Sequence, residues 1–336
     1  MKKNIRLKNF ALLFCITSLS FTSTIQALPI VQNTKLLNRI EIDLKSKDLT
    51  SYQTDVSLNL NKDSIQKKLK QIEEYTGREI NNRKIQKSGK NHLIIKDSTD
   101  SSVFFNMDSH SGSFSYSSSM EKYYKEERTP NLLNNKEALS MAYKHLESLN
   151  LMPKKEQLGK VTQGGLYMAT RKENGDTANY KKMTSVRIDR KLDGIPVLGD
   201  SRIFINMGSN GEIANMIYQW DSILSSKRIP STEKNSIDDI KKNIYKRLEK
   251  GAKDAIKIKF NKIDLVLYDD GKGIIEPAYH IETQLFYKNK KDSYNEPFDF
   301  YVPVLKKPHA FYPFMDKPNL KPIKNNEEQT LNSIDE

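Results

Sequence analysis

Cysteine is almost absent from this chain of 336 residues, in which Cys15 is the only one. The apolar run around it, Phe10 to Phe21, follows basic residues and precedes Ala27, which predicts a secretory signal peptide cleaved after Ala27. The run is short for a bilayer span, although an uncleaved anchor is the alternative. Cys15 lacks the small preceding residue of a lipidated cysteine. After cleavage the chain would hold no cysteine, which excludes disulfides, thiolate zinc sites and a cysteine nucleophile.

The chain also lacks the motifs of catalytic metal sites and phosphate loops. Its five histidines show no metal-ligand spacing, and no His-Glu-x-x-His, Gly-x-Ser-x-Gly or glycine-rich phosphate loop is present. The acid pairs Asp238-Asp239 and Asp269-Asp270 lack calcium-loop spacing and favour a helix start and a solvated turn. His145 lies on an apolar helical stripe, which indicates a packed core residue. We therefore expect no catalytic residue, no metal and no cofactor.

A basic stripe is missing too, although the net charge is +13, from 55 basic and 42 acidic residues. The charge is spread along the chain without the interleaved aromatic residues typical of nucleic-acid binding, so we expect no nucleic-acid partner. Anionic polymers of a bacterial envelope are alternative partners for a basic exported protein. No second apolar run of membrane length occurs, so we expect no membrane span after cleavage and a secreted or periplasmic protein.

The sequence does contain a repeated order of one helix followed by strands. Apolar residues at helical spacing predict helices over 63–76, from 135 to about 149, and over 237–250. A serine-rich run at 111–119 predicts an edge strand. The resulting prediction is an α+β fold of tandem modules, each of one helix packed on an antiparallel sheet. The predicted units are a signal peptide (1–27), an N-terminal α+β module (28–127), a propeptide-like module (128–225), a PepSY-like C-terminal module (226–316) and a polar tail (317–336).

The stretch from Arg190 to Trp220 holds two β-ribbon signals in succession. Asp193-Gly194 is typical of tight hairpin turns, and Pro196 biases the residue before it toward extended backbone, so a strand is predicted to begin near Val197. Alternating apolar residues then predict two strands joined by a turn at 209–211. Trp220 ends the densest apolar patch of this ribbon, which is interpreted as core, with a partner surface as the alternative.

This stretch resembles the extended hairpin in the propeptides of secreted thermolysin-like and fungalysin-like metalloproteases, and in the related PepSY domains. The resemblance is strongest over about thirty residues and extends more loosely over 128–221, where helix, strands and ribbon follow the family's order. It implies a domain that assists the folding of a protease and blocks its active-site cleft. The protease half is missing, because no His-Glu-x-x-His is present, so the module would act on a separate protein or share only a fold.

We therefore predict an exported, non-enzymatic protein that docks on another exported protein, as an inhibitor or folding helper of a protease, with a metalloprotease as the partner that the resemblance implies. An exposed strand edge could add a strand to that partner. The predicted contact residues are Asp193, Gly194, Pro196 and Trp220. The alternatives are an exported hydrolase whose site is assembled from distant residues, and a protein that binds an anionic envelope polymer.

Overall fold

The computed structural model describes residues 29–46, 48–89, 91–118, 120, 123, 129–171, 174–288 and 293–312. The predicted signal peptide, with Cys15, and the predicted polar tail lie outside these residues. Within them, no helix has the length and apolar character that crossing a membrane requires.

The described strands form one mixed sheet of fifteen strands. Its order is β12-β2-β14-β13-β9-β8-β10-β11-β6-β5-β4-β3, with β1 beside β13, β15 beside β14, and β7 beside β8. The strands are β1 (Ile30–Gln32), β2 (Thr50–Thr54), β3 (Arg83–Ser88), β4 (His92–Asp97), β5 (Phe104–Asp108), β6 (Phe114–Ser117), β7 (Leu158–Arg171), β8 (Thr177–Leu192), β9 (Ile195–Gly199), β10 (Arg202–Met207), β11 (Ile213–Gln219), β12 (Ile223–Arg228), β13 (Lys257–Asp269), β14 (Ile274–Lys288) and β15 (Ser293–Pro303).

The predicted fold class is wrong, because this continuous sheet replaces the expected tandem modules. Strand β6, from the first predicted module, pairs with β11 of the second. Strand β1, also from the first, pairs in parallel with β13 of the third. The α+β label is wrong as well, since the described residues are mainly strand with few helices. Local periodicity predicts that a segment is a strand, but it does not say which distant edge that strand pairs with.

The serine-rich run corrects a second expectation. It forms β6, but this strand is not at an edge, because it pairs with β5 on one side and β11 on the other. Its burial pattern explains the position: Phe114 and Tyr116 are buried, and the serines between them are small enough to lie within a crowded sheet.

The predicted helices are present with the expected ends. Helix α2 (Lys62–Thr76) ends at Gly77, whose φ of 64° suits glycine. Helix α4 (Asn135–Ser148) begins with a capping box, in which Asn134 accepts from the Glu137 amide and the Glu137 carboxylate accepts from the Asn134 amide. Helix α5 (Ile237–Gly251) is capped by Ser236. Helix α1 (Asn38–Ser46), after a short 3-10 turn at Thr34–Leu37, was not predicted.

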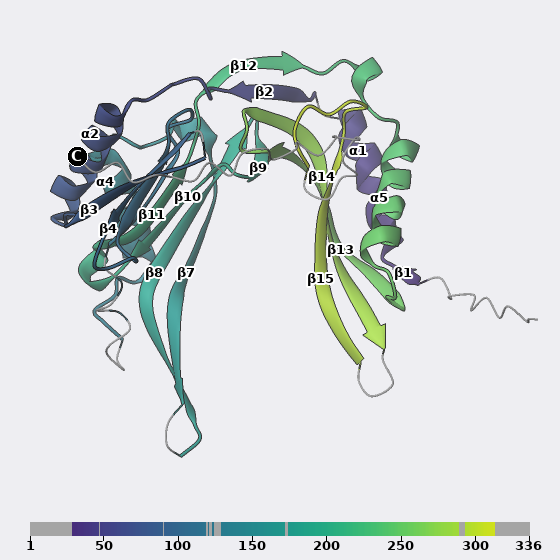
Figure 1. The fold of residues 1–336 in the computed structure, drawn as a ribbon. Helices are drawn as coiled ribbons and strands as arrows, with labels where there is room; N and C mark the ends of the chain where they lie inside the picture. Colours follow the sequence, from purple (N-terminus) through teal and green to yellow (C-terminus); the bar gives the residue numbers. More distant parts are fainter. Residues whose placement is uncertain are drawn as a thin grey trace, which may run out of the picture.

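The molecule is an arch, with helices α1, α2, α4 and α5 on its outside (Figure 1). Helices α2 and α4 cover one half of the sheet and enclose one core, which includes Phe105, Ile188 and Trp220. Helices α1 and α5 cover the other half over a second core, which includes Ile40 and Tyr279. Two long antiparallel pairs, β7–β8 and β14–β15, extend from the top of the arch in the same direction (Figure 1). On the opposite face, Tyr123 packs against Met183 and Ala214 in one half, and Tyr312 packs in a cluster with Tyr268 in the other.

Strand β9 joins the two halves at the top of the arch. It pairs antiparallel with the end of β8 and parallel with the end of β13. The chains meet so closely here that a Cβ on Gly199, which has a φ of 103°, would lie 2.1 Å from the Asp269 carbonyl oxygen. Only glycine fits that position. A second link, the antiparallel pair β2–β12, crosses above it (Figure 1).

Candidate functional site

A cleft of about 370 Å³ lies beside β9, between the β7–β8 pair and the β13–β14 pair. We call it the inter-hairpin cleft. Strand β9 contributes Pro196 and Leu198, and the turn before it contributes Gly194. The start of β7 and the end of β8 line one side, and neighbouring positions of β13 and β14 line the other. The cleft thus belongs to both halves of the molecule and depends on β9 to hold its walls together.

The backbone around this cleft has strand edges without partners. Strand β7 pairs only with β8 among the described strands, so one of its edges is open along its whole length. Strand β13 uses the edge opposite β14 for β1 at 257–259 and for β9 at 267–269. Residues 260–266 of that edge have no strand partner in the described sheet. Unpaired strand edges present backbone N–H and C=O groups that can pair with an added strand.

The charges in the cleft nearly balance. Lys160, Lys191 and Lys262 line it together with Asp189, Asp264 and Glu282. Several are held by pairs, such as Lys262 with Asp264 at 2.5 Å, and the hydrogen bond to Asp264 raises the pKa of the Lys262 ammonium. The cleft is therefore suited to a polar segment that carries both signs of charge rather than to a polyanion.

His280 of β14 forms part of the far wall. His280 stacks on Tyr301, with ring centroids 4.9 Å apart. Burial lowers the pKa of the His280 imidazole, although Glu282 nearby acts in the opposite direction. At neutral pH the ring is thus uncharged, and it offers a flat surface and one hydrogen-bond acceptor to a bound segment.

Three of the four predicted contact residues lie at this cleft or beside it. Asp193 and Gly194 have φ angles of 48° and 75°, which fits a two-residue hairpin turn of type I′ and confirms the predicted turn. Gly194 and Pro196 line the cleft. Asp193 accepts a hydrogen bond of 2.5 Å from the Tyr52 hydroxyl, which ties the turn to β2.

Trp220 lies elsewhere, in the core that α2 and α4 cover, with 8% of its surface exposed. Its indole N–H donates to Gln157 at 3.2 Å, and the Arg190 guanidinium lies 5.1 Å from its ring centroid. The structure thus brings the turn residues together at the cleft and leaves Trp220 out of it.

A charged cluster that no sequence pattern indicated lies beside Trp220. Arg190 is only 1% exposed and donates to the Asp221 carbonyl at 2.9 Å and to Gln157 at 3.2 Å. Burial raises the pKa of the Asp221 carboxyl to about 6, to which Asp269 and Asp200 add, while Ser113 and Arg190 act against it. Burial likewise raises the pKa of Asp200 and of Asp269. Charged side chains at the ends of predicted strands are normally expected to be exposed to solvent. No sequence pattern therefore distinguished the charged residues of this cluster from surface residues.

A polar hollow of about 300 Å³ lies next to this cluster, where β4, β5, β6 and β11 meet the turn between β13 and β14. Asp108, Asp200 and Asp270 line it, and Gln219 donates to Asp200 at 2.9 Å. Asp270 instead accepts from backbone amides of its own turn and of Phe311. Within the described residues, no group of three or more His, Cys, Asp or Glu side chains is arranged to hold a metal ion.

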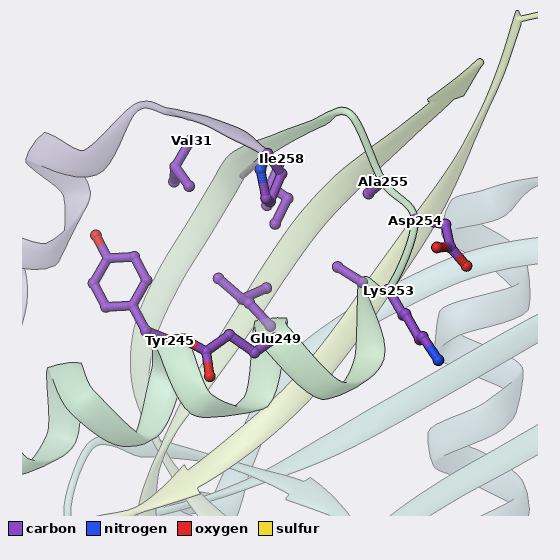
Figure 2. Close-up of a pocket in the computed structure, with 10 residues that line it drawn as sticks. Val31, Tyr245, Glu249, Lys253, Asp254, Ala255 and Ile258 are labelled. Atoms are coloured by element: carbon purple, nitrogen blue, oxygen red, sulfur yellow. The ribbon is translucent and has the colours of Figure 1, made fainter. Parts of the chain in front are cut away.

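An apolar hollow of about 390 Å³ lies on the far side of the molecule, between α5, β1 and β13 (Figure 2). Val31 and Ile258 line it from the strands, and Tyr245 and Glu249 line it from α5. It lies beside the helix-covered core and is separate from the inter-hairpin cleft, with which it shares no lining residue.

Comparison with known proteins assigns no family. No protein-family model matches the chain, and no curated protein matches it. A solved structure that is similar is that of an uncharacterized protein from Eubacterium rectale ATCC 33656, at 10% sequence identity and a TM-score of 0.43, over 77% of this chain and 84% of that chain. A similarity this distant, to a protein without a stated function, gives no guide to function.

Proposed function

We propose that this chain is an exported, non-enzymatic binding protein that holds an extended segment of another exported protein in the inter-hairpin cleft. The observation that carries the proposal is the open edge of β7, which lies beside a cleft formed by both halves of the molecule. A segment added to that edge would gain backbone hydrogen bonds along β7, and its side chains would alternate between the cleft and solvent.

The side chains of the cleft indicate what kind of segment it accepts. Pro196 and Leu198 form an apolar patch beneath β9, and the lysines and acids around them have little net charge. An extended segment with a small apolar residue flanked by polar ones would match this surface. The resemblance of residues 190–220 to metalloprotease propeptides favours an exported protease as the partner, which the protein would inhibit or help to fold.

A cysteine-labelling experiment tests the proposal, because residues 28–336 contain no cysteine. Pro196→Cys introduces a single thiol into the cleft, which a bulky maleimide then blocks. Lys242→Cys places the same label at an exposed position on α5, outside the arch. Each protein is used to capture partners from the secretome of its own organism, and any captured protease is assayed with increasing amounts of the unlabelled protein.

The proposal predicts that a discrete exported protein binds the unlabelled Pro196→Cys protein and the labelled Lys242→Cys protein, and that the label at residue 196 weakens binding at least tenfold. It further predicts that the bound partner slows amide hydrogen exchange in β7. Equal capture by both labelled proteins, or unchanged exchange in β7, would show that the cleft is not the binding site.

A further inference from the structure

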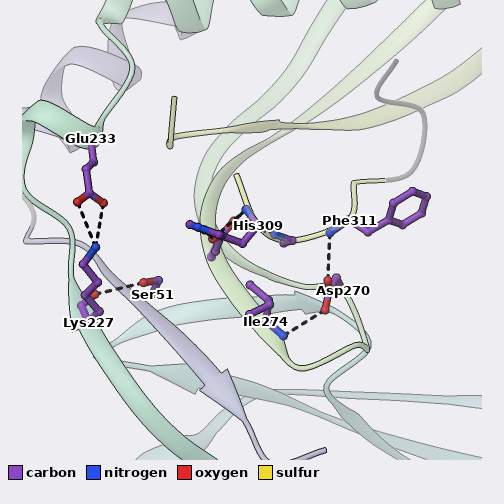
Figure 3. Close-up of polar contacts among 9 residues, drawn as sticks. Ser51, Lys227, Glu233, Asp270, Ile274, His309 and Phe311 are labelled. Carbon is purple, nitrogen blue, oxygen red and sulfur yellow. Dashed lines mark hydrogen bonds and ion pairs between the residues drawn. The ribbon is translucent and has the colours of Figure 1, made fainter. Parts of the chain in front are cut away.

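A hollow of about 400 Å³, which we call the basic hollow, lies beside the C-terminal end of β12, away from the inter-hairpin cleft. Lys227, at the end of β12, lines one side with Glu233 of the 3-10 turn Ser231–Glu233. Lys306, Lys307 and His309, in the segment that follows β15, line the other. Figure 3 shows the Lys227–Glu233 pair and His309 facing the same region from different parts of the chain.

Backbone contacts fix the two sides of this hollow relative to each other. The Lys306 amide donates to the Glu233 carbonyl at 3.0 Å, and Lys234 forms a β-bridge with Leu305. The Asn235 side chain donates to the Leu305 carbonyl at 3.0 Å. The backbone that carries Lys306 is therefore held in place by hydrogen bonds to the 233–235 segment.

A buried carboxylate positions His309. Glu276 has only 2% of its side chain exposed and accepts from the His309 amide at 3.0 Å and from the Ala310 amide at 3.1 Å. The His309 Nδ1 lies 2.8 Å from the same carboxylate, which can only accept, so Nδ1 carries the proton. The imidazole is 73% exposed, and its Nε2 is the nitrogen left for a ligand.

The hollow has an excess of positive charge. Lys227 pairs with Glu233, with nitrogen to oxygen distances of 3.1 and 3.2 Å. Lys306 donates to the Thr232 carbonyl at 2.9 Å, and its positive charge also helps to lower the pKa of the nearby Asp239 carboxyl. Lys307 has no ion pair with any residue that the structure describes. Three lysines therefore line the hollow beside His309, against one acid, Glu233.

We propose that the basic hollow binds a phosphate group. A tetrahedral oxyanion can accept hydrogen bonds from several directions, and the Lys306 and Lys307 ammonium groups supply donors to the hollow, beside the exposed Nε2 of His309. A divalent cation is disfavoured by the same charges. The inference is independent of the proposed strand binding, because the two sites share no lining residue.

Calorimetric titration of residues 28–336 with inorganic phosphate, at ionic strength held constant with sodium chloride, tests the proposal. One phosphate is expected to bind per chain. The double variant Lys306→Gln/Lys307→Gln is expected to bind at least tenfold more weakly, and His309→Gln severalfold more weakly. The matched control is Lys154→Gln/Lys155→Gln, an adjacent pair of exposed lysines outside the hollow, which should bind as the unchanged protein does. Thermal unfolding of each variant checks that it is folded.

A vesicle-sedimentation experiment distinguishes a free phosphate from a lipid headgroup as the ligand. The same proteins are sedimented with vesicles of phosphatidylglycerol and with vesicles of neutral phosphatidylcholine. Binding to the anionic vesicles alone that is lost in the lysine double variant would support the site and identify a lipid source. Binding in either experiment that survives the double variant would overturn the proposal, as would the absence of binding in both.

Discussion

Arg190 is a charged residue that is almost fully buried, and Asp221 beside it is largely removed from solvent. Arg190 donates to the main-chain carbonyl of Asp221 rather than to its carboxylate, which accepts instead from Ser113 at 2.7 Å. The carboxylate is therefore buried with two further acids, Asp200 and Asp269, and with one nearby cation. Such an arrangement favours the protonated carboxyl, which explains why its pKa lies near 6.

We predict that Asp221→Asn stabilises the protein at neutral pH. Because the pKa is higher in the folded state than its ordinary value of 3.8, the folded state binds the proton more tightly, and stability falls as pH rises from about 4 to about 6. Asparagine removes the charge and can still accept from Ser113. Urea unfolding should show a gain on the order of 2 kcal/mol at pH 7.5, by the usual conversion of a pKa shift, and little difference at pH 4. A variant that is less stable than the unchanged protein at pH 7.5 would contradict this account.

Local sequence could not have predicted this cluster. Arg190, Asp200 and Asp221 each lie next to a predicted strand end, where charged residues are normally solvated. These residues come together because β9 pairs with the end of β8 and with the end of β13, which carries Asp269. That contact joins residues about seventy positions apart, and no local spacing contains it.

Helix α4 allows a direct measurement of what its capping box contributes. Asn134→Ala removes the side-chain acceptor of the Glu137 amide, 3.0 Å away, and should cost about 1 kcal/mol of unfolding free energy. The control is Asn135→Ala, at the next, equally exposed position, whose side chain does not cap. Equal losses in the two variants would mean that the cap contributes nothing beyond helix propensity.

Helices and hairpin turns could be predicted here because their signals are local. The stripe of Ala138, Ala142 and Leu146 and the Asp193-Gly194 turn each depend on residues a few positions apart. Strands β3 and β12 were missed because nearly all their residues are exposed and no apolar alternation marks them. The pairing of β1 with β13 was missed because three residues carry too little pattern to select a partner.

The candidate site was predicted only in part, for the same reason. The turn chemistry of Gly194 and Pro196 identified one wall of the inter-hairpin cleft. The opposite wall, with Lys262, Asp264 and His280, depends on the parallel pairing of β9 with β13, which no motif indicates. Trp220 was a predicted contact only through the alternative that its apolar patch is a partner surface; its burial confirms the interpretation of that patch as core.

At the scale of the whole molecule, the N-terminal segment completes the core of the C-terminal half, and this arrangement leads to a further prediction. Ile40 of α1 is fully buried in that core, beside residues of β13 and β14. Ile40→Ala should cost about 2 to 5 kcal/mol and should speed amide exchange in β13, β14 and β15. The control, Ile42→Ala, changes a residue that is 63% exposed and should leave that exchange unchanged. Faster exchange confined to α1 would show that the segment is only loosely attached.

The packing of α1 on late-synthesised strands also delays the folding of the core that it shares with them. The Tyr279 hydroxyl donates to the Ile40 carbonyl across 239 residues of chain. At synthesis rates of about 5 to 20 residues per second, roughly 10 to 50 s separate the emergence of these two residues from a ribosome. During that interval the apolar face of α1 has no core to enter. The core beneath α1 and α5 therefore forms last, and until then α1 exposes an apolar face that could aggregate.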